Sequence, residues 1–429
     1  GMVYFLAVPG GWIADNILGY QKAVLIGALI ITLGHFTLAI PLEQTFILGL
    51  VFVALGTGLL KPNISSIVGQ LYSQNDSRRD SGFTIFYMAI NIGSMLGFAV
   101  CGWLGEKVGW HFGFGAAGVG MLFGVTQFIL FRHQLGEAGK YPNKINEQTQ
   151  RNYIRGVGLV VILIASVVIT GMAGFWSIDP VYFAERFRDF LVVISIIYFI
   201  YLLLFAGLTA NEKKNVLMLL LLFIGAAAFW SGFDQSAGSL TIFTRDYVNL
   251  TFGTFTAPVS WTQFVNPLFV VMFAPFFAYL WVFLGKRNLD PNMPIKFGLG
   301  LILMALGFIV MILAVKYALA SSPVGVQWLL LTYLLHTFGE LTLSPVGLSA
   351  FSKYSPKRYL GQMMGIWFLA SSLGGVLAGL LGGEATESGL ESMSPVFTEL
   401  VYYCLAIAAV LIVLSFFIKG AKTDNIPDE

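Results

Sequence analysis

Residues 56–66 read GTGLLKPNISS, and they lie in the middle of an apolar run that extends from residue 45 to residue 70. A run of this length is typical of a membrane-spanning helix, because a hydrocarbon core of about 30 Å needs roughly 20 apolar residues. Lys61 would then carry an ammonium group at membrane depth, where an ionisable residue costs at least ~2.5–3.5 kcal/mol and is by default functional. A substrate carboxylate is a natural partner for it. The alternatives are a lysine that snorkels to the interface and one held in a permanent ion pair.

The whole chain is as apolar as this stretch. Of its 429 residues, 57% are hydrophobic and only 11% are charged, and the mean hydropathy is +0.80. Soluble domains carry about 25% charged residues, so this composition predicts a protein whose solvent is lipid. The net charge of +2 argues neither for nor against nucleic acid, and no nucleic-acid partner is expected. The two cysteines, Cys101 and Cys404, lie in separate apolar runs and give neither a disulfide framework nor a metal-binding spacing.

Thirteen apolar runs predict an all-α polytopic membrane protein. They cover residues 1–14, 22–41, 45–70, 81–105, 109–131, 155–176, 189–210, 215–240, 258–284, 296–320, 325–351, 361–383 and 397–419. The first run is only part of a span, and no charged segment precedes it. We therefore expect that an upstream helix is missing from this sequence, so that the intact protein would have fourteen.

Basic residues in the loops test this arrangement, because cytoplasmic loops of membrane proteins carry an excess of lysine and arginine. If the loop at residues 14–22 is cytoplasmic, the segments on the inside carry 18 basic residues and those on the outside carry five. Lys61 is the one basic residue left within a span. This asymmetry favours the thirteen spans and predicts a cytoplasmic C-terminus.

A polar linker separates the helices into groups. The linker at residues 132–155 is followed by two helices with almost no interior polar residues, which are expected to face lipid or to pack at the periphery. The expected regions are an N-terminal bundle, a linker with two inserted helices and a C-terminal bundle, over residues 1–131, 132–214 and 215–429. With one upstream helix restored, each bundle would have six helices. Two such halves are a transporter plan, with the site near the membrane midplane.

Glu340 is the second ionisable residue that we single out within a span. His336, Glu340 and Ser344 are four residues apart, so they share one helix face. A desolvated carboxyl can be neutral and become charged when a cation arrives, as a proton-coupled site requires. The alternative is a static, hydrogen-bonded carboxyl that stabilises the bundle. His336 fits a core histidine as well as a site residue.

Other polar and aromatic residues interrupt the spans. Asp234 is expected either in an ion pair at an outer gate or in direct contact with a ligand. The remaining candidates are Trp230, Tyr87, Asn91, Asn266 and Trp367. Each could serve packing alone, but together they would form a polar and aromatic pocket.

Several stretches resemble the proton-dependent oligopeptide transporter family, which belongs to the major facilitator superfamily. They are GGWIAD at residues 10–15, RRDSGF at 78–83, FYMAINIGSM at 86–95, NPLF at 266–269 and GELTLSP at 339–345. The resemblance covers essentially the whole chain. It implies the superfamily fold, with two six-helix bundles and the two inserted helices of bacterial members.

This resemblance implies a symporter that imports di- and tripeptides with protons by alternating access. It implies that Lys61, close to the peptide carboxylate, and Asn91 contact the peptide, and that Glu340 and Asn266 lie at its amino-terminal side. The full predicted substrate set is Lys61, Asn91, Tyr87, Asn266, Glu340, Ser344, Trp230 and Trp367. The predicted coupling and gating set is Glu340, Asp234 and Asp15, with Asp15 in the cytoplasmic latch. Protons are the coupling ion, no cofactor or metal is expected, and a monomer should suffice.

Two departures from the family pattern stand out. Asp234 replaces the family's usual glutamate, which leaves its partner and its role open. The acidic-acidic-arginine motif of the family's first helix is absent before Gly1, so this chain alone is not expected to transport. Residues 185–187 (ERF) look similar, but we place them in an outside loop between the inserted helices and interpret them as a coincidence.

Other functions are less consistent with the sequence. A family relative that carries another small anion, such as nitrate, is the main alternative. An enzyme is not expected, because His35, His111, His133 and His336 are scattered without accompanying nucleophiles or metal ligands. A channel or a structural bundle does not explain a lysine and a glutamate within the spans of opposite halves. The expected location is the bacterial inner membrane.

Overall fold

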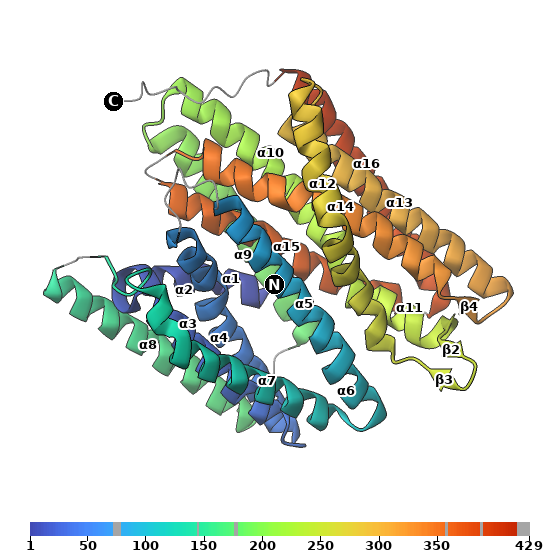
Figure 1. Ribbon diagram of the computed structural model, residues 1–429, viewed down its shortest axis with the longest axis horizontal. Helices are drawn as coiled ribbons and strands as arrows, with labels where there is room; N and C mark the ends of the chain where they lie inside the picture. Colours follow the sequence, from blue (N-terminus) through green and yellow to red (C-terminus); the bar gives the residue numbers. More distant parts are fainter. Residues whose placement is uncertain (72–78, 144–145, 176–178, 357–358, 387–388, 418–429) are drawn as a thin grey trace. The chain divides into compact units, whose positions relative to one another are not determined.

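The computed structural model describes residues 1–71, 79–143, 146–175, 179–356, 359–386 and 389–417. The chain divides into two compact units, Met2–Asp179 and Pro180–Glu429, the second of which also includes Gly1. Helices make up nearly all of both units (Figure 1), which confirms the expected all-α architecture. The expected division into residues 1–131, 132–214 and 215–429 stays a prediction. In the structure, the first of the two inserted helices belongs to the first unit and the second to the other.

The membrane-spanning character of the chain is clear from its helices. Eleven candidate spans in the described parts of the chain are long and apolar enough to cross a membrane, and Met2–Leu18 is a shorter apolar segment. The helix Gln327–Tyr354 is equally long but less apolar, because it carries polar residues such as His336 and Glu340. These segments correspond to the thirteen expected runs, so the chain is a multi-pass membrane protein.

The first unit contains the elements before Asp179. They are α1 (Met2–Phe5), α2 (Ala7–Ile13), η1 (Ala14–Leu18), α3 (Tyr20–Leu38), α4 (Glu43–Gln70), α5 (Arg79–Gly97), η2 (Phe98–Gly102), α6 (Trp103–Lys107), α7 (Trp110–Phe131), η3 (Arg132–Leu135) and α8 (Glu147–Met172). Within this unit α3 packs along α4 and against α7, and α2 packs on α4. Helix α4, which carries Lys61, therefore has neighbours along most of its length.

Small residues allow the close approach of α3 and α4. A Cβ atom added to Gly27 of α3 would lie 2.7 Å from the carbonyl oxygen of Gly56 on α4, closer than real Cβ atoms approach an oxygen. Glycine is therefore required at this crossing. Membrane helices pack through such small residues because lipid supplies no hydrophobic drive for their association. The Gly-rich sequence before Lys61 is thus explained by helix packing.

The second unit contains the elements from Pro180 onward. They are α9 (Pro180–Ile200), η4 (Tyr201–Phe205), α10 (Ala210–Phe233), η5 (Asp234–Ser236), α11 (Ser239–Tyr247), β1 (Val248–Asn249), β2 (Thr251–Phe252), β3 (Phe255–Thr256), η6 (Val259–Phe264), α12 (Val265–Lys286), α13 (Met293–Ala320), β4 (Val324–Gly325), α14 (Gln327–Tyr354), α15 (Leu360–Thr386) and α16 (Leu390–Phe417). Strand β1 pairs with β4 in parallel, and β2 with β3 in antiparallel register. These two-residue strands lie in connections between helices and leave the fold helical.

The core of the second unit lies around α13. This helix packs against α14 and α16, and α10 packs against α15. Phe297 and Phe308 of α13, Phe229 of α10 and Phe397 of α16 are completely buried. Each buried aromatic side chain removes a large apolar surface from its surroundings and fixes the helices that it touches. The polar residues described below are therefore held by a well-packed scaffold.

Polar side chains at the helix ends explain where several helices begin. Thr209 and Glu212 form a capping box at the start of α10, in which the Thr209 N–H donates to Glu212 Oε2 at 2.8 Å. Asn146 caps α8 by accepting from the N–H of Gln148 at 3.0 Å, and Asn292 caps α13. Such caps satisfy N–H groups that have no partner within the helix.

Two expected boundaries of the inserted helices were wrong. Helix α8 begins at Glu147 instead of 155, and α9 begins at Pro180 instead of 189. Residues 185–187 therefore lie inside a helix and not in an outside loop. Proline favours the first helical position, and Arg186 and Arg188 both pair with Asp189 within this polar first part of α9. A search for apolar runs does not detect the first turns of a helix when those turns are polar.

Candidate functional site

The ammonium group of Lys61 lies over an aromatic ring of the first short helix. Lys61 Nζ is 4.1 Å from the centroid of the Tyr4 ring. A cation at this distance is attracted by the negative face of the ring, which contributes about 0.5–2 kcal/mol. Among the described residues, no carboxylate lies within 4.0 Å of Lys61 Nζ. The permanent ion pair considered above is thus absent from this part of the chain, and the exposed ammonium is open to an anion.

The segment around Lys61 is fixed to α2. Asn63 is 1% exposed, and its amide donates to the carbonyl oxygens of Gly10 at 3.2 Å and Leu59 at 2.6 Å. Pro62 lies inside α4 and has no N–H, so the carbonyl oxygen of Gly58 lacks its usual hydrogen bond within the helix. Gly10 of α2 lies so close to this carbonyl that a Cβ atom on Gly10 would overlap it. A buried side-chain hydrogen bond and a close backbone contact therefore hold this turn in place. Lys61 therefore extends from a turn that is bonded to α2.

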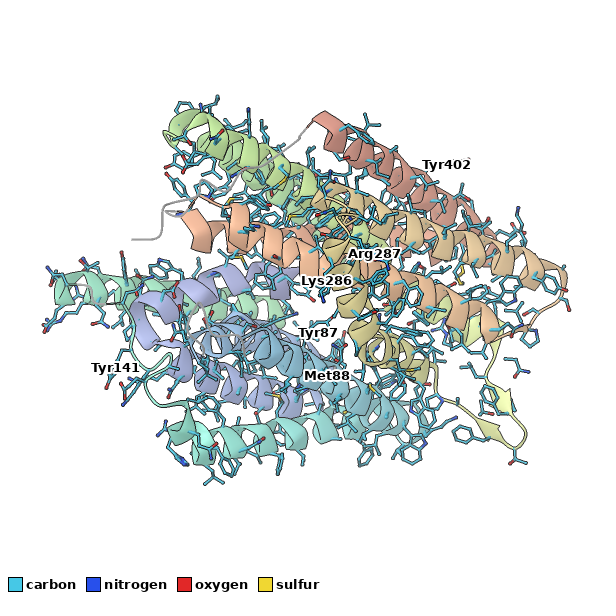
Figure 2. All side chains as sticks on the ribbon, turned by 45° about the horizontal axis from the view of Figure 1, so that its top comes forward. Tyr87, Met88, Tyr141, Lys286, Arg287 and Tyr402 are labelled. Carbon is cyan, nitrogen blue, oxygen red and sulfur yellow. The ribbon has the colours of Figure 1, made fainter. Side chains whose placement is uncertain are left out.

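Asn91 and Tyr87 lie one turn apart on α5. The amide of Asn91 is buried and donates to the carbonyl oxygen of Tyr87 at 2.9 Å. This bond uses one of the two amide protons and leaves the Oδ1 atom as an acceptor. Figure 2 labels Tyr87 on the same helix. The common face expected from the sequence is present, and the role of both residues in binding substrate stays a prediction.

Glu340 belongs to a polar cluster between α12 and α14. The amide of Asn266 donates to Glu340 Oε2 at 3.0 Å and to Thr337 Oγ1 at 3.0 Å. Thr337 in turn donates to the carbonyl of Tyr333 at 2.7 Å. Glu340 is only 9% exposed, so a hydrogen bond donated to its carboxyl group is electrostatically stronger here than in water. The sequence predicted both Asn266 and Glu340, and the structure joins them directly.

His336 points to a different neighbour from Glu340. Its ring is 2% exposed and lies 4.9 Å from the ring of Phe308 on α13, where it packs against Gly307. Four residues along a helix leave an angular offset of about 40° between two side chains. That offset turns His336 toward α13 while Glu340 bonds to α12. The arrangement favours the alternative of a core histidine.

Three further candidates of the second unit lie in its packed interior. Trp230 is surrounded by Phe229 and Phe233 on α10, with its ring centroid 5.3 Å from that of Phe233. Trp367 is 6% exposed and packs 5.5 Å from Phe351. The Trp230 Nε1 and Ser344 Oγ atoms are buried and have no hydrogen-bond partner among the described residues. The assignment of all three residues to substrate binding stays a prediction.

Asp234 lies where α10 gives way to the 3₁₀ turn η5. Its neighbour Gln235 is completely buried and donates to the carbonyl of Ala378 on α15 at 3.0 Å. Ser239 donates to Gln235 Oε1 at 2.7 Å. The glutamine thus fixes this turn to α15, and it places the carboxyl of Asp234 near Gly375. The role of Asp234 in gating or coupling stays a prediction.

Asp15 lies in η1, in a hydrogen-bonded junction between this element and the linker after η3. Tyr20 donates its hydroxyl to Asp15 Oδ1 at 2.6 Å, and the N–H of Asn143 donates to the Asp15 carbonyl at 2.7 Å. The Gln21 amide donates to the carbonyl of Ala138 at 2.8 Å. In the same linker, a side-chain hydrogen bond to Glu137 raises the pKa of Lys140. These bonds hold Asp15 in a defined junction, and its role in a cytoplasmic latch stays a prediction.

Comparison with known proteins supplies the family. The sequence model of the POT family matches residues 21–390. The chain belongs to the POT family. It is 40% identical to the peptide transporter YePEPT of Yersinia enterocolitica, over 96% of this chain and 83% of that protein. It is 37% identical to a di-/tripeptide transporter of Lactococcus lactis, over 86% of this chain and 76% of that protein.

Solved structures support the same conclusion. A POT family transporter in complex with a thioalcohol-conjugated peptide superposes with a TM-score of 0.88 at 32% identity, over 98% of this chain and 86% of that chain. The resemblance to the POT family and the expected superfamily fold are therefore confirmed. The chain is not an enzyme, because it belongs to a family of transporters.

Sequence reasoning about this POT transporter missed three residues of the polar clusters. Tyr4 lies in the short first helix and gives no polar signal on its own. Thr337 and Asn63 are small or singly placed polar residues, which are common within spans. The only sequence signal was position, since Asn63 follows Lys61 by two residues and Thr337 precedes Glu340 by three.

Proposed function

We propose that this protein is a proton-coupled symporter, which imports di- and tripeptides by alternating access across a bacterial plasma membrane. The observation that carries the proposal is a pair of intramembrane groups of opposite kind. Lys61 has an open ammonium group over Tyr4, and Glu340 has a buried carboxyl bonded to Asn266. A peptide zwitterion carries a carboxylate for the first and an ammonium for the second. The names of the relatives, which include peptide transporters, support this substrate class.

Coupling to protons follows from the environment of Glu340. A buried carboxyl is stabilised in its neutral form by desolvation and in its charged form by a donor or a nearby cation. Glu340 has the Asn266 amide as donor, so arrival of the ammonium end of a peptide would favour loss of its proton. At −100 mV each inward proton contributes about 2.3 kcal/mol to accumulation. Protons are the only coupling species that this account requires.

The test is uptake of radiolabelled dialanine by proteoliposomes that contain the full-length protein, under an inward proton gradient. We expect accumulation by the wild type and loss of accumulation in Lys61→Ala and in Glu340→Gln. Lys214→Ala is the matched control, because Lys214 is an exposed lysine in the first part of α10. Unchanged uptake by both site variants would overturn the residue assignment. Competition by nitrate and not by dipeptides would instead favour the anion-carrying alternative.

A further inference from the structure

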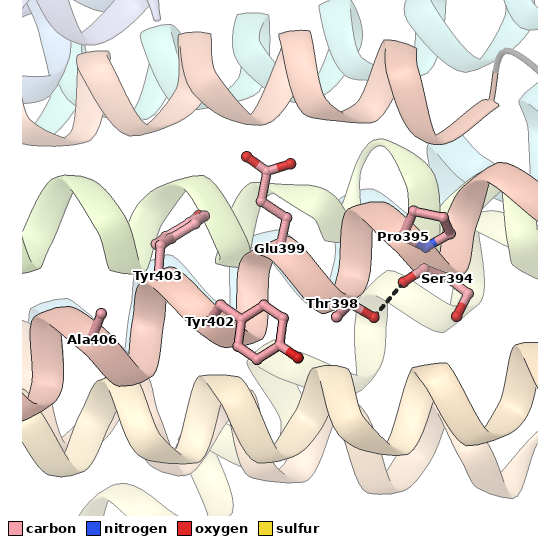
Figure 3. Close-up of a pocket in the computed structure, with 7 residues that line it drawn as sticks. All are labelled: Ser394, Pro395, Thr398, Glu399, Tyr402, Tyr403 and Ala406. Carbon is pink, nitrogen blue, oxygen red and sulfur yellow. Dashed lines mark hydrogen bonds between the residues drawn. The ribbon is translucent and has the colours of Figure 1, made fainter.

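The hydroxyl group of Thr337 makes two hydrogen bonds of opposite direction. This side chain of α14 is completely buried and donates to the carbonyl oxygen of Tyr333 at 2.7 Å. Its oxygen accepts from the Asn266 amide of α12 at 3.0 Å. The hydroxyl groups of Thr342 and of Thr398 (Figure 3) also donate to the carbonyl four residues earlier, a common bond for threonine in a helix. Among the described residues, Thr337 differs from these two because it also accepts a bond from another helix.

The directions of these bonds fix the orientation of the Asn266 amide. A hydroxyl group has only one proton to donate. Because Thr337 donates that proton to Tyr333, its oxygen accepts the other bond, and it therefore meets the Nδ2 end of the amide instead of the Oδ1 end. The same nitrogen donates its second proton to Glu340 Oε2 at 3.0 Å. Glu340 thus faces a donor, and a donor stabilises the charged form of a carboxyl group.

A reversed amide would favour the opposite protonation state of Glu340. With Oδ1 in the place of Nδ2, Asn266 would offer an acceptor, which only a protonated carboxyl group can use. The Thr337 proton would have to turn toward Oδ1 and give up its bond to the Tyr333 carbonyl. Thr337 and Glu340 are both buried, so water does not replace a bond that is lost here. The hydroxyl group of Thr337 therefore opposes the reversal.

We propose that Thr337 is a positioning residue for proton coupling, which holds the Asn266 amide with its N–H toward Glu340 and so lowers the affinity of Glu340 for a proton. This inference rests on the proposed role of Glu340 as the group that carries the proton. Thr337 acts only through Asn266, and it needs no contact with the peptide. The ammonium end of a bound peptide would add to the same preference for the charged carboxylate.

Other titratable groups lie on α14 and on the helices packed against it, which are α10, α12, α13 and α15. They include Asp234 at the end of α10, Tyr279 and Lys286 of α12, Lys296 of α13, Glu384 of α15, and Tyr333 and His336 of α14. Lys296 is paired with Asp290, and His336 packs against α13. None of these groups changes in the variants below. A difference between variants at position 337 therefore reports the hydroxyl group of Thr337.

Infrared difference spectroscopy of the full-length protein tests this inference without any substrate. The band of the protonated Glu340 carboxyl group, assigned by its loss in Glu340→Gln, gives the pH at which Glu340 is half protonated. We expect this midpoint to rise by roughly one pH unit in Thr337→Val, a tenfold gain in proton affinity, as a weakened hydrogen bond to a charged group predicts. Thr337→Ala should show the same rise. Thr337→Ser keeps the hydroxyl group and should stay close to the wild type.

Thr342→Val and Thr398→Val are the matched controls, because each removes a hydroxyl group that donates within its own helix. Both should keep the wild-type midpoint. An unchanged midpoint in Thr337→Val would overturn the inference. An equal rise in Thr337→Ser would assign the effect to packing and would also overturn it, as would an equal rise in Thr342→Val. Failure of the wild type to take up dialanine would contradict the proposed function, whereas the infrared midpoints still decide the role of Thr337.

Discussion

Single hydrogen bonds decide what the intramembrane charges of this protein can do. The sequence predicted Lys61, Asn266 and Glu340 because a polar group inside an apolar run is costly and rarely accidental. It could not predict that Asn266 bonds to Glu340. These residues are 74 positions apart in the sequence, and their contact depends on how α12 packs against α14. Nor could it predict Tyr4 beside Lys61, since an aromatic residue in a membrane helix is ordinary. The sequence therefore predicted which residues are functional candidates, but not which side chains they contact.

The bond between Asn266 and Glu340 gives a prediction for binding. Asn266→Ala removes the donor to a buried carboxyl, and a hydrogen bond to a charged group contributes about 1.5–3 kcal/mol. We expect dialanine affinity to fall by roughly 10- to 100-fold, measured by isothermal titration calorimetry in detergent. Thr342→Val is the control, because its hydroxyl donates to the Phe338 carbonyl of its own helix and, among the described residues, to no other group. Equal affinity of Asn266→Ala and the wild type would show that this contact does not position Glu340.

The contact between Lys61 and Tyr4 gives a second prediction. Tyr4→Phe keeps the ring face below the ammonium, whereas Tyr4→Leu removes it. A cation–π contact of about 0.5–2 kcal/mol predicts a roughly 2- to 30-fold loss of dialanine affinity in Tyr4→Leu. Tyr4→Phe should stay close to the wild type in the same titration. If the two variants lose affinity equally, the hydroxyl and not the ring is the important group.

At the scale of helices, apolar runs predicted the number of spans and their order, but not their polar ends. Helix α9 begins nine residues before the expected position, because Pro180 starts it and Asp189 pairs with Arg186 and Arg188. The Gly-rich sequence of α4 packs closely against a neighbouring helix. That neighbour is α3.

The crossing of α3 and α4 predicts which glycine substitutions disrupt the first unit. Gly27→Ala places a Cβ atom 2.7 Å from the Gly56 carbonyl oxygen, so backbone must shift. Overpacking of this kind costs about 1–3 kcal/mol, and we expect a lower melting temperature in a fluorescence-based thermal unfolding assay. Gly124→Ala on α7 is the control, because a Cβ atom there meets nothing within 4 Å. A Gly27 variant as stable as the Gly124 variant would contradict the close packing.

For the whole molecule, family membership rests on sequence and fold together. The sequence suggested a resemblance over essentially the whole chain, and the POT family model matches residues 21–390 of it. Each unit carries some of the predicted substrate-binding residues. Lys61 and Asn91 lie in the first unit, and Asn266 and Glu340 lie in the second. A substrate that bears one charge of each sign gives both parts a purpose. The proposal therefore depends on coupled movement of peptide and proton.

The most direct measurement follows proton movement in proteoliposomes that contain the full-length protein and a pH-sensitive dye in the lumen, with no initial pH gradient. Dialanine added outside should acidify the lumen as it enters, because a symporter moves both species in one direction. Glu340→Gln should abolish this acidification, and Thr342→Val should preserve it. Entry of dialanine without any change in luminal pH would contradict the account.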